Sequence, residues 1–207
     1  MGASEINTKH PVCSIGHSTR TLKTFLELLT MHSVKRLVDV RTIPRSKRNP
    51  HYNQEPLQEA LGTAGISYTH LERLGGLRRA LAGSRNLAWH NLSFRGFADY
   101  MQTTEFTAGL GELIRLAEKE TVALMCAEAV PWRCHRTMIA DALAIRGIIV
   151  KEIISATTSR PHTLTPWARI QGLEIIYPLK ALEAVENRND YRRQSADVQR
   201  EIRVEKH

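Results

Sequence analysis

The sequence predicts an α/β protein with a mostly parallel five-stranded sheet and helices on both faces. Three observations lead to this fold class. Short apolar runs recur along the chain, amphipathic helical patterns separate them, and glycines stand where helices should end. Strands that alternate with helices in this way build parallel sheets that are covered on both sides.

The first repeat is the clearest. The apolar runs 12–15 and 37–40 are predicted strands, and the residues between them carry leucines and a phenylalanine at the i, i+3, i+4, i+7 spacing of a helix (Leu22, Phe25, Leu26 and Leu29). The same alternation predicts further strands over 66–71, 121–125 and 148–154. It predicts further helices from Pro56 to a stop at Gly65, along the stripe 106–117, and from Arg136 to a stop at Gly147.

Two regions do not follow the alternation. Residues 72–103 contain a Gly-Gly pair and five arginines (Arg73, Arg78, Arg79, Arg85 and Arg95), and we interpret them as an Arg-rich insertion over the sheet edge. Residues 187–207 are rich in charge and poor in apolar anchors, which predicts a solvated or disordered C-terminal extension. We therefore expect one α/β domain over residues 1–186 and a charged tail over 187–207.

Composition limits the classes of function. The chain has 207 residues, too few apolar positions in a row for a membrane span, and no signal-like segment over 1–10. Its three cysteines suit reduced thiols, so we expect a cytoplasmic protein with no membrane partner. A net charge of +8 favours anionic partners, namely small phosphorylated molecules or nucleic acid, although solvated surface charge gives the same total.

The turn after the first strand has the residues of an anion site. It reads Ile-Gly-His-Ser-Thr-Arg over 15–20, and the glycine permits a tight turn into the helix. Ser18 and the free amide groups at the helix start can bind an anion, with His17 and Arg20 nearby. The alternative is that Ser18 or Thr19 only caps the helix.

The turn after the second strand is strongly basic. Arg41 and Arg45 stand in a proline-stiffened loop with Lys47 and Arg48, and no acidic residue follows Asp39 there. Because a guanidinium matches the oxygens of phosphate, we expect Arg41 and Arg45 to bind an anion. Asp39 more simply pairs with a nearby arginine inside the protein.

The turn after the fourth strand carries the most reactive residues. Cys126 and Glu128 follow an apolar run, and Cys134, His135 and Arg136 begin the next helix. Either thiol is a candidate nucleophile, because a helix start and arginines lower a thiol pKa. Glu128, His135 or His17 would then act as acid or base, and Arg136 would bind the anion.

The spacing of these residues argues against a phosphatase-like mechanism, and a metal site is a less favoured use. A phosphatase-like cysteine loop needs an arginine six positions after the thiol, and that position after Cys126 is Trp132. Cys126, Cys134 and His135 suit a metal, alone or with His17 or His70, but adjacent Cys and His rarely share one ion. We therefore expect no metal, and the residues identify no cofactor. A simpler alternative for Cys126 is that it is a small buried residue at the end of a strand.

These motifs resemble the uncharacterised family DUF488. The resemblance rests on five motifs in order: Ser-Ile-Gly-His-Ser-Thr-Arg (14–20), Val-Asp-Val-Arg-x-x-Pro-Arg-Ser (38–46), Gly-Ile-Ser-Tyr (65–68), Leu-Gly-Gly (74–76) and Met-Cys-Ala-Glu-Ala with Cys-His-Arg (125–136). It covers about 12–167 and implies an α/β fold but no reaction. Val130 stands where the family usually has an acidic residue.

The turns after parallel strands open on one edge of the sheet, so the candidate residues should converge in one crevice. The set is His17, Arg20, Arg41, Arg45, His70, Cys126, Glu128, His135 and Arg136. We therefore expect an enzyme that acts on an anionic, phosphate-bearing substrate. The alternatives are a nucleic-acid-binding module, with Tyr52, Trp89 and Trp132 as stacking aromatics, and a small-anion sensor without catalysis.

Overall fold

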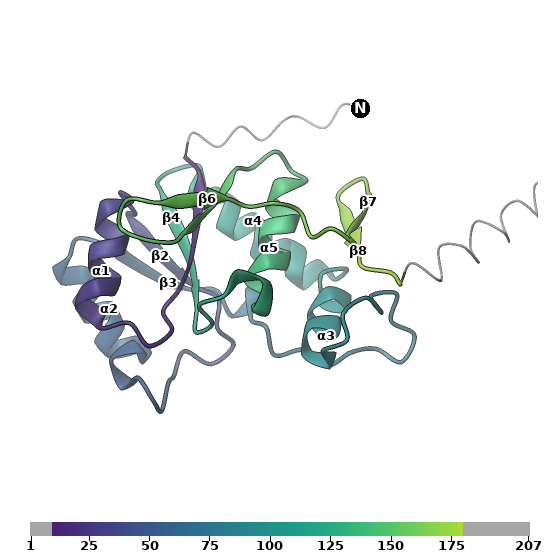
Figure 1. Ribbon diagram of the computed structural model, residues 1–207, viewed down its shortest axis with the longest axis horizontal. Coiled ribbons are helices and arrows are strands. Elements are labelled where there is room, and N and C mark those ends of the chain that lie inside the picture. Colours follow the sequence, from purple (N-terminus) through teal and green to yellow (C-terminus); the bar gives the residue numbers. More distant parts are fainter. Residues whose placement is uncertain (1–9, 180–207) are drawn as a thin grey trace, which may run out of the picture.

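The computed structural model describes residues 10–179 (Figure 1). The charged tail expected over 187–207, and residues 180–186 of the expected domain, lie outside the described residues. The described chain forms a six-stranded sheet with the order β3-β2-β4-β1-β5-β6 and a separate hairpin of β7 and β8. The predicted α/β class is confirmed.

Five strands are parallel, and each lies where the sequence predicts it. They are β1 (Val12–Gly16), β2 (Arg36–Asp39), β3 (Ser67–His70), β4 (Val122–Cys126) and β5 (Val150–Ile153). The sixth strand, β6 (Ser159–Pro161), pairs with β5 in the antiparallel direction. It was not predicted, and neither was the hairpin of β7 (Arg169–Gln171) and β8 (Glu174–Ile176), because three residues are too few to show an alternation.

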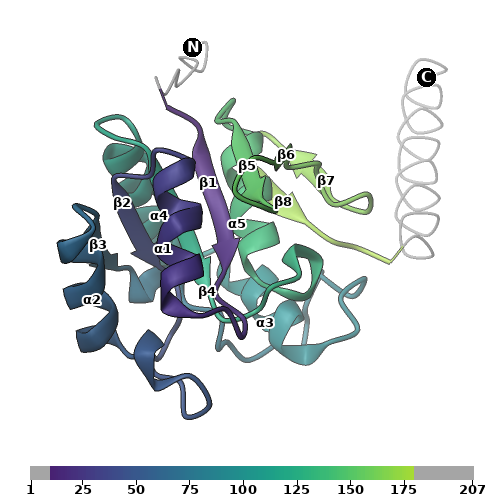
Figure 2. The ribbon, with the colours of Figure 1, turned by 60° about the vertical axis from the view of Figure 1, so that its left-hand side comes forward.

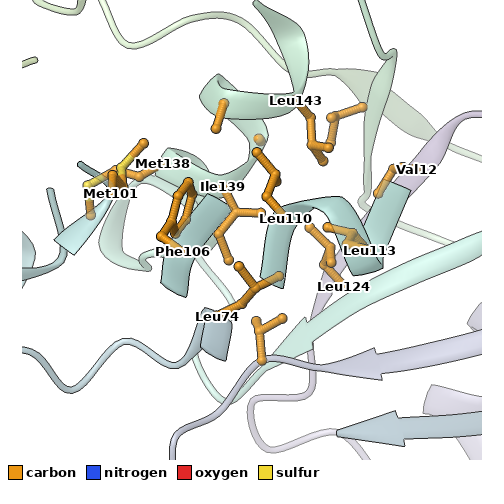
Figure 3. Close-up of a cluster of buried hydrophobic side chains, with 14 of the residues drawn as sticks. Val12, Leu74, Met101, Phe106, Leu110, Leu113, Leu124, Met138, Ile139 and Leu143 are labelled. Carbon is orange, nitrogen blue, oxygen red and sulfur yellow. The ribbon is translucent and has the colours of Figure 1, made fainter. Parts of the chain in front are cut away.

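Helices cover both faces of the sheet, as predicted (Figure 2). One face packs against α1 (Leu22–Met31) and α2 (Gln54–Thr63), and the other packs against α3 (Leu92–Tyr100), α4 (Thr104–Ala117) and α5 (Arg136–Ala144). Figure 3 shows Leu110 and Leu113 of α4 beside Ile139 and Leu143 of α5, which together fill the second face. No helix within residues 10–179 is long and apolar enough to cross a membrane.

The residues of β4 point alternately to the two faces, as a period of two requires. Ala123 and Met125 belong to the hydrophobic cluster of α1 and α2, whereas Leu124 and Cys126 belong to the cluster of α4 and α5. This alternation directs the thiol of Cys126 toward α5. The remaining cysteine, Cys13, is buried on the opposite face.

The segment 72–103 is more ordered than an insertion over the sheet edge. It contains a 3-10 turn, η2 (Glu72–Leu74), and the unpredicted helix α3, whose Phe97 is fully buried against Phe106 of α4. The composition of the segment as a whole drew attention away from this helix, which contains only one arginine, Arg95. The segment forms part of the core and, as shown below, one wall of a cleft.

The chain diverges between β1 and β4, which lie side by side with Gly16 opposite Cys126. The helix after β1 covers one face of the sheet and the helix after β4 covers the other. Such a point, where neighbouring connections leave in opposite directions, opens a crevice in an α/β sheet. Gly16 is required here, because a Cβ atom would stand 1.9 Å from the carbonyl oxygen of Glu128.

Candidate functional site

A cleft of about 330 Å³ lies at the carboxyl ends of β2 and β4. Its walls come from the turns after these strands, the Gly-Gly segment and the start of α3. The lining residues are Arg41, Thr42, Ile43, Arg45, Gly76, Leu77, Ser93, Phe94, Cys126, Ala127, Glu128, Arg133, Cys134 and His135. The cleft therefore brings together six of the residues that the sequence predicts for the site: Arg41, Arg45, Cys126, Glu128, Cys134 and His135.

The two thiols and the imidazole are in mutual contact. The ligand atoms of Cys126, Cys134 and His135 all lie within 4.8 Å of one another, and the Cys134 Sγ is 3.7 Å from the His135 Nδ1. The other ring nitrogen of His135 is 2.9 Å from the carbonyl oxygen of Val40. Since a carbonyl oxygen only accepts, Nε2 carries the proton and Nδ1 faces Cys134 with a free lone pair.

The surroundings keep this imidazole neutral and in position. Burial lowers the pKa of His135, and the nearby guanidinium of Arg136 acts in the same direction. Phe97 contacts the ring edge to face, with centroids 5.0 Å apart. On another side, a Cβ atom at Gly76 would stand 2.5 Å from Nδ1, so the second glycine of the Gly-Gly pair is needed to leave room for the ring.

Arg136 lies behind the thiols and is 1% exposed. Its guanidinium donates to the Ser14 hydroxyl at 2.8 Å and to the Glu128 carbonyl at 2.7 Å. No carboxylate within the described chain pairs with it, and its Nε has no hydrogen-bond partner there. A buried charge without a counter-charge is costly, so a negative group next to Arg136 is strongly favoured.

The thiol of Cys134 supplies that negative group. Burial by itself would raise its pKa, but a hydrogen bond from Cys126 and the charge and hydrogen bonds of Arg136 outweigh burial and lower the pKa to about 6. The same hydrogen bond, together with burial, raises the pKa of Cys126 well above its usual range. Cys134 is thus the thiolate at neutral pH, and Cys126 is its protonated partner.

Three expected residues of the turn after β1, His17, Ser18 and Arg20, lie outside the cleft, because this turn folds toward α1 and α2; their predicted place in the cleft is wrong. The His17 ring stacks on Tyr52 with centroids 4.1 Å apart, and its Nδ1 donates to the Ser18 carbonyl. Burial lowers the pKa of His17 to about 4. Arg20 donates to the Gly16 carbonyl, and the side chain that caps α1 is that of Thr21 rather than Ser18 or Thr19.

Arg41 lines the cleft, but other protein groups occupy most of its guanidinium. Its Nε and Nη2 bond to the carboxylate of Asp39, and Nη2 also donates to the Tyr52 carbonyl at 2.9 Å. The sequence-based pairing of Asp39 with a nearby arginine is therefore present. His70 stays outside the cleft, since its Nε2 donates to the Arg41 carbonyl at 2.7 Å.

Free cations stand at the mouth of the cleft. Arg45 and Arg133 are exposed, and neither side chain has a hydrogen-bond or ion-pair partner among residues 10–179. Glu128 is also exposed, and its carboxylate accepts a bond from the Val130 amide at 3.2 Å. Arg133 was not predicted as a site residue, although its place between Cys126 and Cys134 in the sequence was a usable signal.

The cluster of Cys126, Cys134 and His135 has the ligand types and proximity to hold a soft metal ion. Neither His17 nor His70 belongs to this cluster. The buried guanidinium of Arg136 beside both sulfurs would repel a dication, so the electrostatics favour a thiolate over a metal.

Comparison with known proteins places the chain in one family. No curated protein and no solved structure matches it. The model of the family described as "Domain of unknown function DUF488" matches residues 21–143, which contain the cleft residues from Arg41 to His135. Because this match covers more than half of the 207 residues, the protein belongs to the DUF488 family.

Proposed function

We propose that the protein is an enzyme that uses the Cys134 thiolate as a nucleophile on an anionic, phosphate-bearing substrate held in the cleft. One observation carries the proposal. Arg136 is a buried cation with no carboxylate partner in residues 10–179, and the thiol beside it has a pKa of about 6. A thiolate maintained at neutral pH by its surroundings is typical of reactive cysteines rather than packing ones.

The neighbouring groups have complementary roles in this proposal. The Cys126 thiol and the Arg136 guanidinium stabilise the Cys134 thiolate, and the neutral His135 ring lies beside it with Nδ1 3.7 Å from Sγ. The exposed guanidiniums of Arg45 and Arg133 would bind the phosphate oxygens. Glu128, at the mouth, is the carboxylate that could exchange a proton with bound substrate.

The nucleic-acid alternative loses part of its support. Tyr52 is 0% exposed and Trp89 is buried, so neither offers a face to a base on the surface. The small-anion sensor would use the same cleft and the same arginines. A sensor of this kind needs no reactive thiol, whereas the proposed enzyme does.

The test is the alkylation rate of the thiols by iodoacetamide between pH 5 and 9. We expect one fast-reacting thiol with a midpoint near pH 6, lost in Cys134→Ser and retained in Cys126→Ser with a higher midpoint. Phosphate should protect the wild type, and Arg45→Gln with Arg133→Gln should weaken this protection. A midpoint near 8.5, or reaction only after denaturation, would rule out a nucleophilic Cys134.

Phosphate binding in calorimetry separates the sensor from the enzyme. Binding that is unchanged in Cys134→Ser, combined with a slow thiol in the wild type, would favour a sensor.

A further inference from the structure

We infer that a second cavity, adjacent to the cleft, binds a planar aromatic ring of the kind that a nucleobase presents. This cavity has a volume of about 330 Å³ and lies between the start of α5 and the chain around β6. The sequence contains three tryptophans, and all three line it: Trp89, Trp132 and Trp167. The inference goes beyond the proposed function and does not depend on a reactive thiol.

Trp132 presents the stacking surface. It is 62% exposed and stands in the 3-10 turn η3 (Pro131–Arg133), which begins with a proline. The guanidinium of Arg160 lies 5.9 Å from the centre of its ring. A large indole held on a stiff turn at the rim of a cavity costs little conformational entropy when it stacks on a ligand ring.

The other two indoles form the inner wall. Trp89 and Trp167 meet edge to face with ring centroids 5.5 Å apart. Neither buried ring N–H has a hydrogen-bond partner in the described chain. Neighbouring protein atoms cover both N–H groups, so these two indoles offer a ligand in the cavity ring carbons for van der Waals contact.

The floor of the cavity is rigid because buried polar groups hold it. Asp141 of α5 accepts bonds from His162 at 2.8 Å, Tyr177 at 2.9 Å and the Thr165 amide at 3.1 Å. These bonds dock the chain from β6 to β8 alongside α5, as Figure 1 shows. A cavity shaped by such a network is preformed, which reduces the cost of binding.

The charges that line the cavity are already paired. Glu152 accepts from Arg160, and His162 lies between Glu152 and Asp141. No unpaired acidic or basic side chain of the described part lines the cavity, so a neutral ring suits it better than a charged one.

The cavity and the cleft meet at η3. Trp132 lines the cavity and Arg133 lines the cleft, and adjacent Cα atoms are about 3.8 Å apart. In a nucleotide, the base would stack on Trp132 and the phosphate would lie at Arg133. This extension to the phosphate rests on the proposed function.

The experiment follows the three indole N–H signals in ¹H–¹⁵N spectra; those of Trp132 and Trp167 report on this cavity, whereas Trp89 also contacts Phe94 of the cleft. The probes are adenosine, guanosine, cytidine and uridine, with ribose as the control, and Trp→Phe variants assign the signals. We expect all three signals to shift saturably with at least one nucleoside and not with ribose. Trp132→Ala should weaken binding at least tenfold and Trp132→Phe less, while Met31→Ala, which removes an equally exposed apolar side chain on α1, should leave binding unchanged.

Absence of a saturable shift with all four nucleosides, or equal shifts with ribose, would overturn the inference. Binding of a single-stranded oligonucleotide but of no nucleoside would overturn it too, and would assign the tryptophans to nucleic acid. Nucleosides carry no phosphate, so Cys134→Ser should bind them as the wild type does. A nucleoside monophosphate should bind more tightly only while Arg133 is present, and the lack of that gain would count against the anion cleft alone.

Discussion

Two buried arginines at the same edge of the sheet have opposite surroundings. Arg41, after β2, forms an ion pair with Asp39, whose carboxylate also accepts a bond from Tyr68. Arg136, at the start of α5, is more deeply buried and has no carboxylate partner within residues 10–179. The charge of Arg41 is neutralised by a permanent anion, whereas the charge of Arg136 lowers the pKa of a thiol.

The difference separates structure from chemistry within one sheet edge. A guanidinium that is already paired contributes to the fold, and Arg41 has only its unpartnered Nη1 left to offer a ligand. A guanidinium that lacks a carboxylate stabilises whichever neighbouring group can become an anion, and here that group is Cys134. We therefore expect the region around Arg41 to respond to mutation in stability and the region around Arg136 to respond in thiol reactivity.

The largest expected effect is on the structural side. Asp39→Asn leaves Arg41 buried without a counter-charge, so the free energy of unfolding should fall by about 3–5 kcal/mol, measured by urea denaturation. The double variant Asp39→Asn with Arg41→Gln should recover part of the loss, because it removes the unpaired charge. A loss below about 1 kcal/mol would show that the pair is not the main support of this region.

The pH dependence of stability tests the same region through His17. Its pKa falls from 6.5 to about 4 in the folded protein, so the unfolded chain takes up a proton first as the pH drops. The contribution of neutral His17 to the free energy of unfolding should be fully present above pH 6.5. It should decline by about 3 kcal/mol as the pH falls from 6.5 to 4.

His17→Phe, which keeps the stacking on Tyr52, should flatten this decline in acid denaturation curves. His162 does not titrate in this acid range. Burial by itself would lower its pKa, but hydrogen bonds to Asp141 and Glu152 outweigh burial and raise the pKa to about 9. Its contribution is complete below pH 6.5 and is lost as the pH rises to 9. An unchanged acid slope in His17→Phe would place the titrating group elsewhere.

On the reactive side, Arg136→Met should raise the thiol pKa of Cys134 from about 6 toward the value of 8.5 for a free cysteine. If the pKa reaches 8.5, the thiolate fraction at pH 7, and with it the alkylation rate, falls about 30-fold, roughly 2 kcal/mol. The hydrogen bond from Cys126, the largest cause that lowers this pKa, remains in the variant and makes the loss smaller than this limit. Thiolate absorbance against pH measures the shift. Arg136→Lys keeps the positive charge and should retain most of the low pKa, and a thiol pKa near 6 in Arg136→Met would assign its cause to Cys126.

The smallest effect is expected for Glu128→Gln. The side chain is exposed, and the bond that it accepts from the Val130 amide can persist with the amide oxygen of glutamine. The free energy of unfolding should change by less than about 0.5 kcal/mol, and the thiol pKa of Cys134 should stay near 6. A clear rise or fall of the thiol pKa would show that the Glu128 charge reaches the thiolate.

The elements of the fold follow from local patterns. Five strands and four helices were predicted because short apolar runs and the 3.6-residue helical period identify them without knowledge of any neighbour. Helix α3 was missed although Phe94, Phe97, Ala98 and Met101 follow the i, i+3, i+4, i+7 spacing, because the arginines and glycines of 72–103 led us to interpret the whole segment as an insertion. The reactive residues after β4 were identified for a similar reason, because Cys126, Cys134 and His135 lie close together in the sequence.

What the sequence alone determined is therefore the set of elements, the edge of the sheet where polar residues gather, and the cluster of thiols and imidazole. Only the tertiary structure decided which arginine receives a carboxylate, that His17 turns inward onto Tyr52, and that three tryptophans far apart in sequence line one cavity. The physical reason is that a side chain's charge state and partners depend on burial and on contacts between distant segments. A local pattern records neither, so equivalent residue types at one sheet edge become a structural ion pair in one place and an activated thiol in another.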